Sequence, residues 1–335
     1  MKLMRYISKL MSILACLHLW SCDVHEFPHP IPVDENISFV LRLNYDTNLP
    51  LHKVLEYTED ARSAESSQYD IRYIVKVYPA TTETGTKELH SFVFTKDNIA
   101  ELNHSVTLNL KHGHYKFMVW TDYVNEGTDT DLFYNAVSFD KIACVIGDKY
   151  QGNTDFKDAF RGTIVSEVSS DVSEALVTME RPVAKLRFIS TDFDSFISQV
   201  TEAQAIQTTS KAISLDDFKV VLRYQGYLAN SYNMQSDQSS GSLTKEEFES
   251  TIYSISDTEV EMGFDYVFAE ASETSVHVSL DICDVNGNVL STFTTKEIPL
   301  VRGKLTTVNL QFLDSLSGGG AAIDPDYNGD VNIEM

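Results

Sequence analysis

Residues 37–45 read Ile-Ser-Phe-Val-Leu-Arg-Leu-Asn-Tyr, with a large apolar side chain at every second position. Successive side chains of a β-strand point to opposite faces, so this spacing predicts a strand with one buried face. Similar runs follow at residues 69–79, 90–95, 104–123, 132–146, 174–180, 217–228, 260–269, 275–283, 288–299 and 304–313. Because almost no helical segments intervene, no parallel βαβ pattern arises. The sequence therefore predicts an all-β fold built from antiparallel β-sandwiches.

One segment, residues 192–209, has helical spacing. Phe193, Phe196, Ile197 and Val200 lie at i, i+3, i+4 and i+7 behind Asp192, a residue type that favours helix starts. We expect this short helix to close one end of the second sandwich.

The chain has 335 residues, a length that favours about two domains. A second β region begins at Glu-Arg-Pro-Val-Ala-Lys, residues 180–185, and Gly318, Gly319 and Gly320 form a flexible hinge. The domains predicted from these breaks are a leader at 1–21, a proline-rich tether at 22–35, sandwiches at 36–180 and 181–316, and a hinge with a terminal strand at 317–335.

Two short motifs predict turns. Asn286-Gly287, between two alternating apolar runs, is typical of a type I′ hairpin turn. His112-Gly113-His114 offers two imidazoles but has no third metal ligand nearby, so we interpret it as the turn of a hairpin.

The charge balance excludes one class of partner. The chain carries 26 Lys and Arg against 49 Asp and Glu, a net charge of -23. A nucleic-acid-binding protein needs clustered basic residues to neutralise phosphates, and the sequence has no such cluster beyond its N-terminus. We therefore expect no nucleic-acid partner.

The N-terminus has the layout of a bacterial export signal. Lys2, Arg5 and Lys9 precede an apolar run at residues 10–20 that is too short to span a bilayer. The tetrad Leu19-Trp20-Ser21-Cys22 resembles a lipobox, although Trp20 is unusual there. We expect Cys22 to be the lipidated first residue of the mature protein, which places the chain on the outer membrane through palmitate-type acyl chains.

The remaining candidate sites are weak. Asp324, Asp326, Asn328 and Asp330 resemble part of a calcium loop, but the ligand expected after the glycine falls on Met335, so a turn before a terminal strand is the preferred interpretation. Cys144 and Cys283 are expected to be unpaired and buried. Tyr224, Tyr227 and Tyr232 could stack on sugars or could be ordinary strand aromatics.

No nucleophile motif is present, so we expect neither enzymatic activity nor a cofactor or a metal.

Several longer segments are similar to one known family. They are Cys-Asp-Val-His-Glu-Phe-Pro at 22–28, residues 119–124 and 150–160, Glu-Arg-Pro-Val-Ala-Lys at 180–185, and residues 298–313 with Arg-Gly-Lys-Leu-Thr-Thr-Val. Together they resemble the fimbrillin superfamily of Bacteroidales, the subunits and anchors of type V pili. The resemblance implies two tandem transthyretin-like sandwiches, export as a lipoprotein, and assembly by strand exchange between subunits. In that family some subunits are cut after an Arg near the first strand, whereas anchors are not cut. Arg62 lies in a polar loop that a protease could reach, but no basic recognition context surrounds it, which favours the anchor or accessory role.

The function expected from these observations is a surface-exposed, lipid-anchored fimbrial anchor or accessory subunit. Its partners would be fimbrial subunits, bound by β-strand complementation. The alternative is a glycan-binding surface lipoprotein of a polysaccharide-uptake system, which would also be acidic, β-rich and anchored by lipid.

The lipid anchor can be tested by Cys22→Ala. This variant should leave the membrane fraction and take up no labelled palmitate, because the acyl chains supply nearly all membrane affinity of an acidic protein. Cys16→Ala is the matched control, since that cysteine is removed with the leader. A Cys22→Ala variant that stays on the membrane would contradict lipidation.

Overall fold

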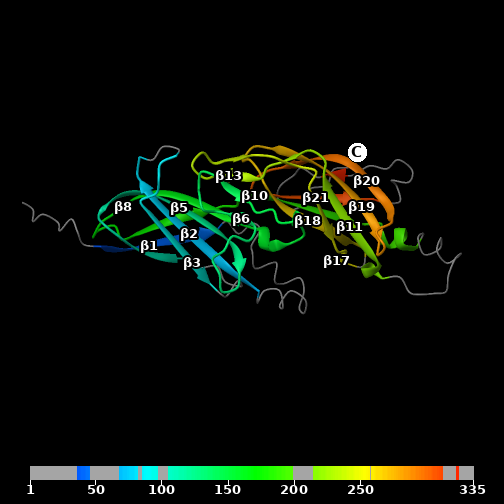
Figure 1. Ribbon diagram of the computed structural model, residues 1–335, viewed down its shortest axis with the longest axis horizontal. Coiled ribbons are helices and arrows are strands. Elements are labelled where there is room, and N and C mark those ends of the chain that lie inside the picture. Colours follow the sequence, from blue (N-terminus) through cyan, green and yellow to red (C-terminus); the bar gives the residue numbers. More distant parts are fainter. Residues whose placement is uncertain are drawn as a thin grey trace, which may run out of the picture.

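The structure, a computed structural model, describes residues 36–45, 68–81, 85–96, 105–198, 214–256, 258–311 and 322–323. These residues form antiparallel-rich β-sheets with one short helix, which confirms the predicted all-β sandwich class. Within this part of the chain, no helix has the length and apolar character needed to cross a membrane. The strands run largely along the long axis of an elongated molecule, shown in Figure 1.

The first half of the chain builds one sandwich of two sheets. The sheet orders are β4-β1-β9 and β3-β2-β5-β8. The strands are β1 (Ile37–Tyr45), β2 (Tyr69–Pro79), β3 (His90–Lys96), β4 (Ser105–Leu110), β5 (Gly113–Asn125), β8 (Phe160–Val168) and β9 (Glu174–Met179).

The second half repeats this strand order. Its sheets contain β18-β10-β21 and β16-β11-β19-β20, with the short strands β17 and β22 added at the two ends of the first sheet. The strands are β10 (Val183–Ser190), β11 (Phe218–Tyr224), β16 (Glu247–Ser250), β17 (Tyr253–Ser254), β18 (Val260–Phe268), β19 (Thr274–Asp284), β20 (Val289–Leu300), β21 (Leu305–Leu310) and β22 (Ala322–Ile323).

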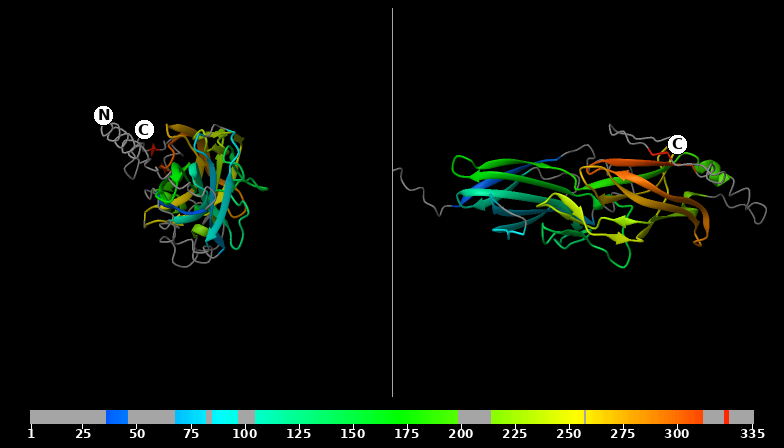
Figure 2. Two further views of the ribbon diagram at one scale, coloured as in Figure 1. Left: turned by 90° about the vertical axis from the view of Figure 1, so that its left-hand side faces the viewer. Right: turned by 90° about the horizontal axis from the view of Figure 1, so that it is seen from above.

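The repeat extends to strand direction. When the short strands β17 and β22 are left out, each half has seven of the strands given above, and its first strand lies antiparallel to the fourth and parallel to the seventh. This holds for β1 with β4 and β9, and for β10 with β18 and β21. The two sandwiches follow one another along the molecule, as Figure 2 shows in its right-hand view. The residue limits given above for the two domains remain predictions.

A small sheet of order β14-β13-β7-β6 joins the two halves. Its strands are β6 (Tyr134–Asn135), β7 (Ile142–Cys144), β13 (Ser231–Asn233) and β14 (Gln238–Ser240), and β12 (Tyr227–Leu228) pairs with β15 (Leu243–Thr244) nearby. We call this the bridging sheet, because β7 from the first half pairs with β13 from the second. Apart from residues at their ends, β2 and β5 are almost wholly buried on both faces. Tyr134 of the bridging sheet accounts for part of this burial by packing edge-on against Trp120 of β5, at 5.5 Å.

Two apolar clusters fill the molecule. The first contains mainly residues of the first sandwich, but Tyr232, Phe264 and Phe268 of the second half belong to it. The second cluster fills the other sandwich. The helix at residues 193–198 lies at its edge, where Phe193 and Phe196 are buried and pack on Phe218, as the helical spacing predicts.

One turn prediction is wrong, and a second is right about the hairpin but wrong about the turn type. Residues 112–114 do not close a hairpin, because β4 pairs with β1 whereas β5 pairs with β2 and β8, so this turn carries the chain from one sheet to the other. Residues 284–289 do close the β19–β20 hairpin, but the turn is not type I′, since Gly287 has a positive φ and Asn286 does not. Instead the Asp284 carboxylate accepts hydrogen bonds from the backbone N–H groups of Asn286 and Asn288.

Strand β8 crosses β9 very closely at Gly162. A Cβ atom at this position would lie 2.5 Å from Val177 Cγ1 and 2.7 Å from the carbonyl oxygen of Thr178. The backbone atom cannot move aside without disturbing β9, so we expect Gly162→Ala to lower the free energy of unfolding by about 1–3 kcal/mol. The measurement is urea denaturation.

Gly147→Ala is the matched control, because a Cβ atom there meets nothing within 4 Å. Its unfolding free energy should stay the same or rise by up to about 1 kcal/mol. Equal stability of the two variants would contradict the close crossing.

Candidate functional site

The sequence-predicted site residues lie outside the described part of the chain. These are Cys22, Arg62, Asp324, Asp326, Asn328 and Asp330. Among the described residues, no group of three or more His, Cys, Asp or Glu side chains could hold a metal ion. The candidate site is therefore built from strand edges and from the junction of the two halves.

Strand β1 fills a slot between β4 and β9. Its backbone pairs with β4 from Ile37 to Arg42 and with β9 from Val40 to Tyr45. The inward side chains of Phe39, Leu41, Leu43 and Tyr45 are all buried, and Phe39 stacks on Phe117 of β5 at 5.2 Å. Burial of such a side chain contributes about 1.5–3 kcal/mol, so β1 is an integral part of the first core.

The outer face of β1 contributes little to the stability of the first sandwich. Arg42 donates from Nε and Nη2 to the Glu174 carboxylate, at 2.9 and 2.7 Å, but both side chains are more than half exposed. Exposed ion pairs stabilise a protein by less than about 1 kcal/mol. The buried apolar side chains of β1 therefore contribute more than its outer face to holding a strand between β4 and β9.

A second strand position lies at the other end of the chain. Residues 322–323 form β22 and pair antiparallel with β21, where Val308 faces Ile323 and Asn309 faces Ala322. The alternating residues 331–334, where the terminal strand is expected, lie outside the described residues.

The most distinctive sequence motifs form the junction between the halves. Residues 150–160 place Tyr150, Asp155, Lys157 and Asp158 beside β10 and β18, and all four side chains are buried. Lys157 Nζ lies 2.5 Å from Asp265 Oδ1 on β18. These charges are paired inside the protein, as buried charges must be.

Two further ion pairs complete this buried junction. Arg181 Nε donates to both Asp158 oxygens at 2.8 and 2.9 Å, and its guanidinium lies over the Phe160 ring. Burial raises the pKa of Asp158 above its usual value, while Arg181 opposes that rise. Lys185 donates to Asp155 at 2.7 Å. The Glu-Arg-Pro-Val-Ala-Lys motif therefore binds the loop that precedes β8.

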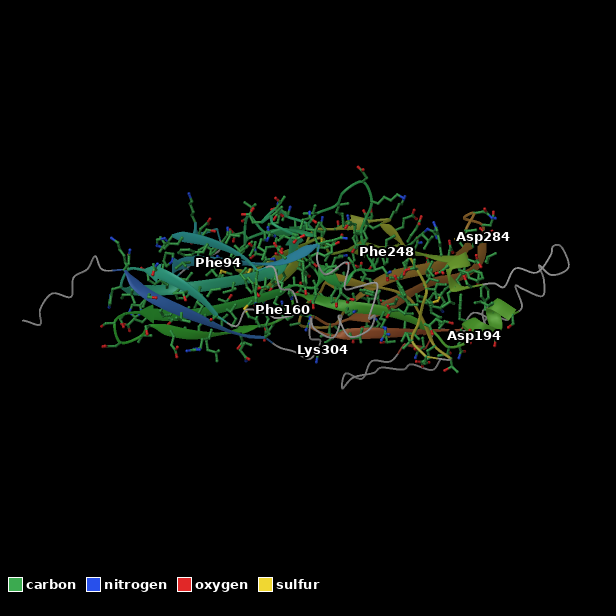
Figure 3. The ribbon with its side chains drawn as sticks, turned by 90° about the horizontal axis from the view of Figure 1, so that it is seen from below. Phe94, Phe160, Asp194, Phe248, Asp284 and Lys304 are labelled. Atoms are coloured by element: carbon green, nitrogen blue, oxygen red, sulfur yellow. The ribbon has the colours of Figure 1, made fainter. Side chains whose placement is uncertain are left out.

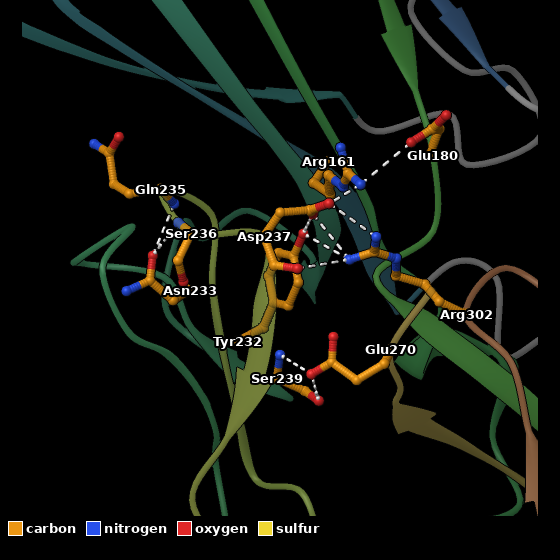
Figure 4. Close-up of polar contacts among 10 residues, drawn as sticks. All are labelled: Arg161, Glu180, Tyr232, Asn233, Gln235, Ser236, Asp237, Ser239, Glu270 and Arg302. Carbon is orange, nitrogen blue, oxygen red and sulfur yellow. Dashed lines mark hydrogen bonds and ion pairs between the residues drawn. The ribbon is translucent and has the colours of Figure 1, made fainter. Parts of the chain in front are cut away.

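A half-exposed cluster near the bridging sheet adds a third contact between distant segments, shown in Figure 4. Asp237 accepts hydrogen bonds from Arg302 Nη1 and Nη2 at 2.8 and 2.9 Å and from the Tyr232 hydroxyl, and it forms an ion pair with Arg161 at 2.8 Å. Burial alone would raise the pKa of Asp237, but the Tyr232 hydrogen bond and the two arginines lower it below its usual value. Arg302 belongs to the Arg-Gly-Lys motif, so this motif too has a structural partner.

Sequence reasoning did not identify Lys157 or Asp265. The available signal was Asp265 itself, a carboxylate in the middle of the otherwise uncharged residues 262–268 of β18. The tyrosine cluster considered for sugar stacking is not a surface platform, because Tyr224 and Tyr232 are buried and only Tyr227 is exposed.

Cys144 and Cys283 are unpaired, as predicted, and Cys283 is buried while Cys144 is partly buried. Burial raises the pKa of the Cys144 thiol to about 11, so it is not a reactive thiolate at neutral pH.

The buried Asp158–Arg181 pair should be more important for stability than the exposed Arg42–Glu174 pair. Asp158→Ala leaves the Arg181 charge buried beside an apolar side chain, so we expect a loss of about 3–5 kcal/mol of unfolding free energy. Glu174→Ala, the control, should cost less than about 1 kcal/mol. Urea denaturation at neutral pH measures both, and similar losses would contradict the assigned difference.

Solved structures from Bacteroidales resemble this chain over most of its length. A candidate adhesin from Bacteroides thetaiotaomicron is 11% identical, with a TM-score of 0.46 over 90% of this chain and 98% of that one. A candidate cell adhesion protein from Bacteroides uniformis is 10% identical, with a TM-score of 0.44 over 88% and 98%. The fimbrial anchor protein Mfa2 from Porphyromonas gingivalis is 11% identical, with a TM-score of 0.42 over 90% and 99%.

The sequence comparisons give one curated relative and one family. Thermostable direct hemolysin 2 of Vibrio parahaemolyticus is 27% identical over 142 residues, which are 41% of this chain and 74% of that protein. The model of a family described as a family of unknown function, DUF6562, matches residues 34–335. This match covers both sandwiches and the terminal segment, and the chain belongs to the DUF6562 family.

Proposed function

We propose that this chain is a fimbrial anchor or accessory subunit at the cell surface, held on the outer membrane by a lipid at Cys22. In this role it binds partner subunits by β-strand complementation. The observation that carries the proposal is the pairing of β22 with β21, because it supports a strand-forming capacity for the segment after the glycine hinge.

The β22 pairing is short enough to be exchanged. Strand β21 has six residues, and β22 faces two of them. Backbone hydrogen bonds of the same kind form when a strand pairs with a neighbouring protein, so moving the segment from its own sheet to a partner's sheet conserves most of them. In the remaining tail, Val331 and Ile333 alternate with polar residues and would supply side chains for a partner's pockets.

The slot of β1 supports an anchor rather than a polymerising role. Cleavage after Arg62 would separate β1 from the rest of the chain and remove four buried side chains from the first core. An anchor keeps β1 in place, and the tether before it then leads from the lipid directly into a strand paired on both sides. Tension along β1 would act in shear on two rows of hydrogen bonds.

The two ends of the molecule then face different partners. Strand β1 lies in one end of the molecule, while Asp194 and Asp284 lie at the other end, as Figure 3 shows. With the tether at the β1 end, the second sandwich points away from the membrane, on the side where a fimbrial subunit would bind.

Deleting residues 318–335 tests the complementation. Loss of Val331 and Ile333, at about 1.5–3 kcal/mol each, should reduce the fimbrial subunit that co-purifies from native outer membranes by at least about tenfold. The melting temperature should change by only a few degrees, because β22 pairs through two residues. Val285→Ser, at the exposed tip of the β19–β20 hairpin, is a control that should leave co-purification unchanged.

Equal recovery of the subunit with the deleted and full-length chains would overturn the proposed role of the tail. Intact mass of the native mature protein decides the class of subunit. A lipidated Cys22 at the N-terminus is expected for an anchor, whereas a species starting at Ser63 would place the chain among the processed, polymerising subunits.

A further inference from the structure

The junction contains a buried lysine and a buried aspartate in direct contact. Lys157 Nζ lies 2.5 Å from Asp265 Oδ1, and the two side chains are 5% and 1% exposed. The residues are 108 positions apart, with Lys157 in the turn η3 (Asp155–Lys157) before β8 and Asp265 on β18. The pair therefore links the two halves of the chain.

A tyrosine hydroxyl bridges the two groups. Tyr150 accepts a hydrogen bond from Lys157 Nζ at 2.9 Å and donates one to Asp265 Oδ2 at 2.7 Å. Tyr224 also donates to Oδ2, at 2.8 Å, and the backbone N–H of Tyr266 donates to Oδ1 at 2.8 Å. Every oxygen of the carboxyl group is thus held in a fixed direction.

The surroundings of the pair exclude water, since the two side chains are 5% and 1% exposed. The ammonium of Lys157 lies 4.3 Å from the centroid of the Tyr150 ring, which in turn packs against Tyr224 and Phe248. Burial raises the pKa values of Tyr150 and Tyr224 well above the ordinary tyrosine value, so both hydroxyls keep their protons. Removing charges from water is costly, and an amide formed from this pair would carry no charge.

We propose that Lys157 and Asp265 condense to an intramolecular amide after the chain folds. Tyr150 relays one proton from Nζ to Oδ2, which gives a neutral amine and a neutral carboxyl group. The nitrogen lone pair then attacks Cγ of Asp265, and a second proton from the nitrogen goes to the Oδ2 hydroxyl, which leaves as water. One C–N bond forms, one C–O bond breaks, and neither an oxidant nor another reactant is needed.

The fold accelerates amide formation by holding the two groups in contact. Two groups held in contact react as if at a very high concentration, which removes most of the entropic barrier to amide formation. The backbone N–H of Tyr266 donates to Oδ1, where charge develops during attack, and Tyr224 holds Oδ2, the oxygen that leaves. The product closes a covalent loop from the first half of the chain to the second.

A second buried pair in the junction provides the comparison. Lys185 Nζ lies 2.7 Å from Asp155 Oδ1, but its side chain is 17% exposed and its ammonium lies over the ring faces of Phe264 and Tyr266. The Tyr266 hydroxyl contacts Asp155. The bridging hydroxyl that Tyr150 places between amine and carboxyl distinguishes the Lys157 pair.

Tryptic mapping of the full chain, purified in detergent and unfolded before digestion, tests the amide. Trypsin does not cleave after an acylated lysine, so the expected product is residues 150–161 joined to residues 246–296, lighter than the two peptides by one water. Unfolded and boiled, the wild-type chain should also migrate ahead of Lys157→Arg on a denaturing gel, because a covalent loop makes it more compact.

Matched variants identify the bond. Lys185→Arg should retain the branched peptide, Lys157→Arg should lose it, and Tyr150→Phe should reduce it because the proton relay is removed. Cleavage after Lys157 with residues 246–296 recovered as an unmodified linear peptide would overturn the proposal. This wild-type result is decisive even if a variant fails to fold.

Discussion

The antiparallel pairing of β7 with β13 is the contact on which the arrangement of the two halves depends. It pairs Ile142 with Tyr232 and Ala143 with Ser231. The segment between β5 and β8 and the segment between β11 and β16 thereby form one bridging sheet. That sheet contributes Tyr134 and Tyr232 to the apolar cluster that also holds the side chains of β2 and β5. Because an apolar strand must be covered on both faces, neither half is complete without the other.

The bridging sheet also explains the charges buried beside it. With the halves held together, Lys157 meets Asp265, and Arg181 meets Asp158, away from water. Buried ion pairs rarely add stability over apolar residues of the same size, but removing one partner is costly. Such pairs favour a single arrangement of the two halves. The motifs at residues 150–160 and 180–185 are accordingly parts of this junction.

The two halves share one strand order, but different parts of the chain occupy the equivalent positions. In the first half the strand between the fourth and the seventh is β1, which follows directly on the tether. In the second half the corresponding place is taken by β10, which continues from the first half, and the open side of β21 is available to β22. One architecture thus places the first strand, β1, in one half and the short β22 pairing in the other, which fits the anchor role proposed above.

The sequence alone determined the β class, most strand positions and the helix after Asp192, because alternation and helical spacing are properties of neighbouring residues. It predicted β2 at residues 69–79, where the strand lies, but it missed β8 and did not show that β4 and β5 belong to different sheets. Only the tertiary structure decided the repeated topology, the bridging sheet, and the partners of Lys157 and Asp265. Those contacts join residues far apart in the sequence, such as Lys157 and Asp265 at 108 positions, and no local pattern records which distant side chain will lie beside a buried charge.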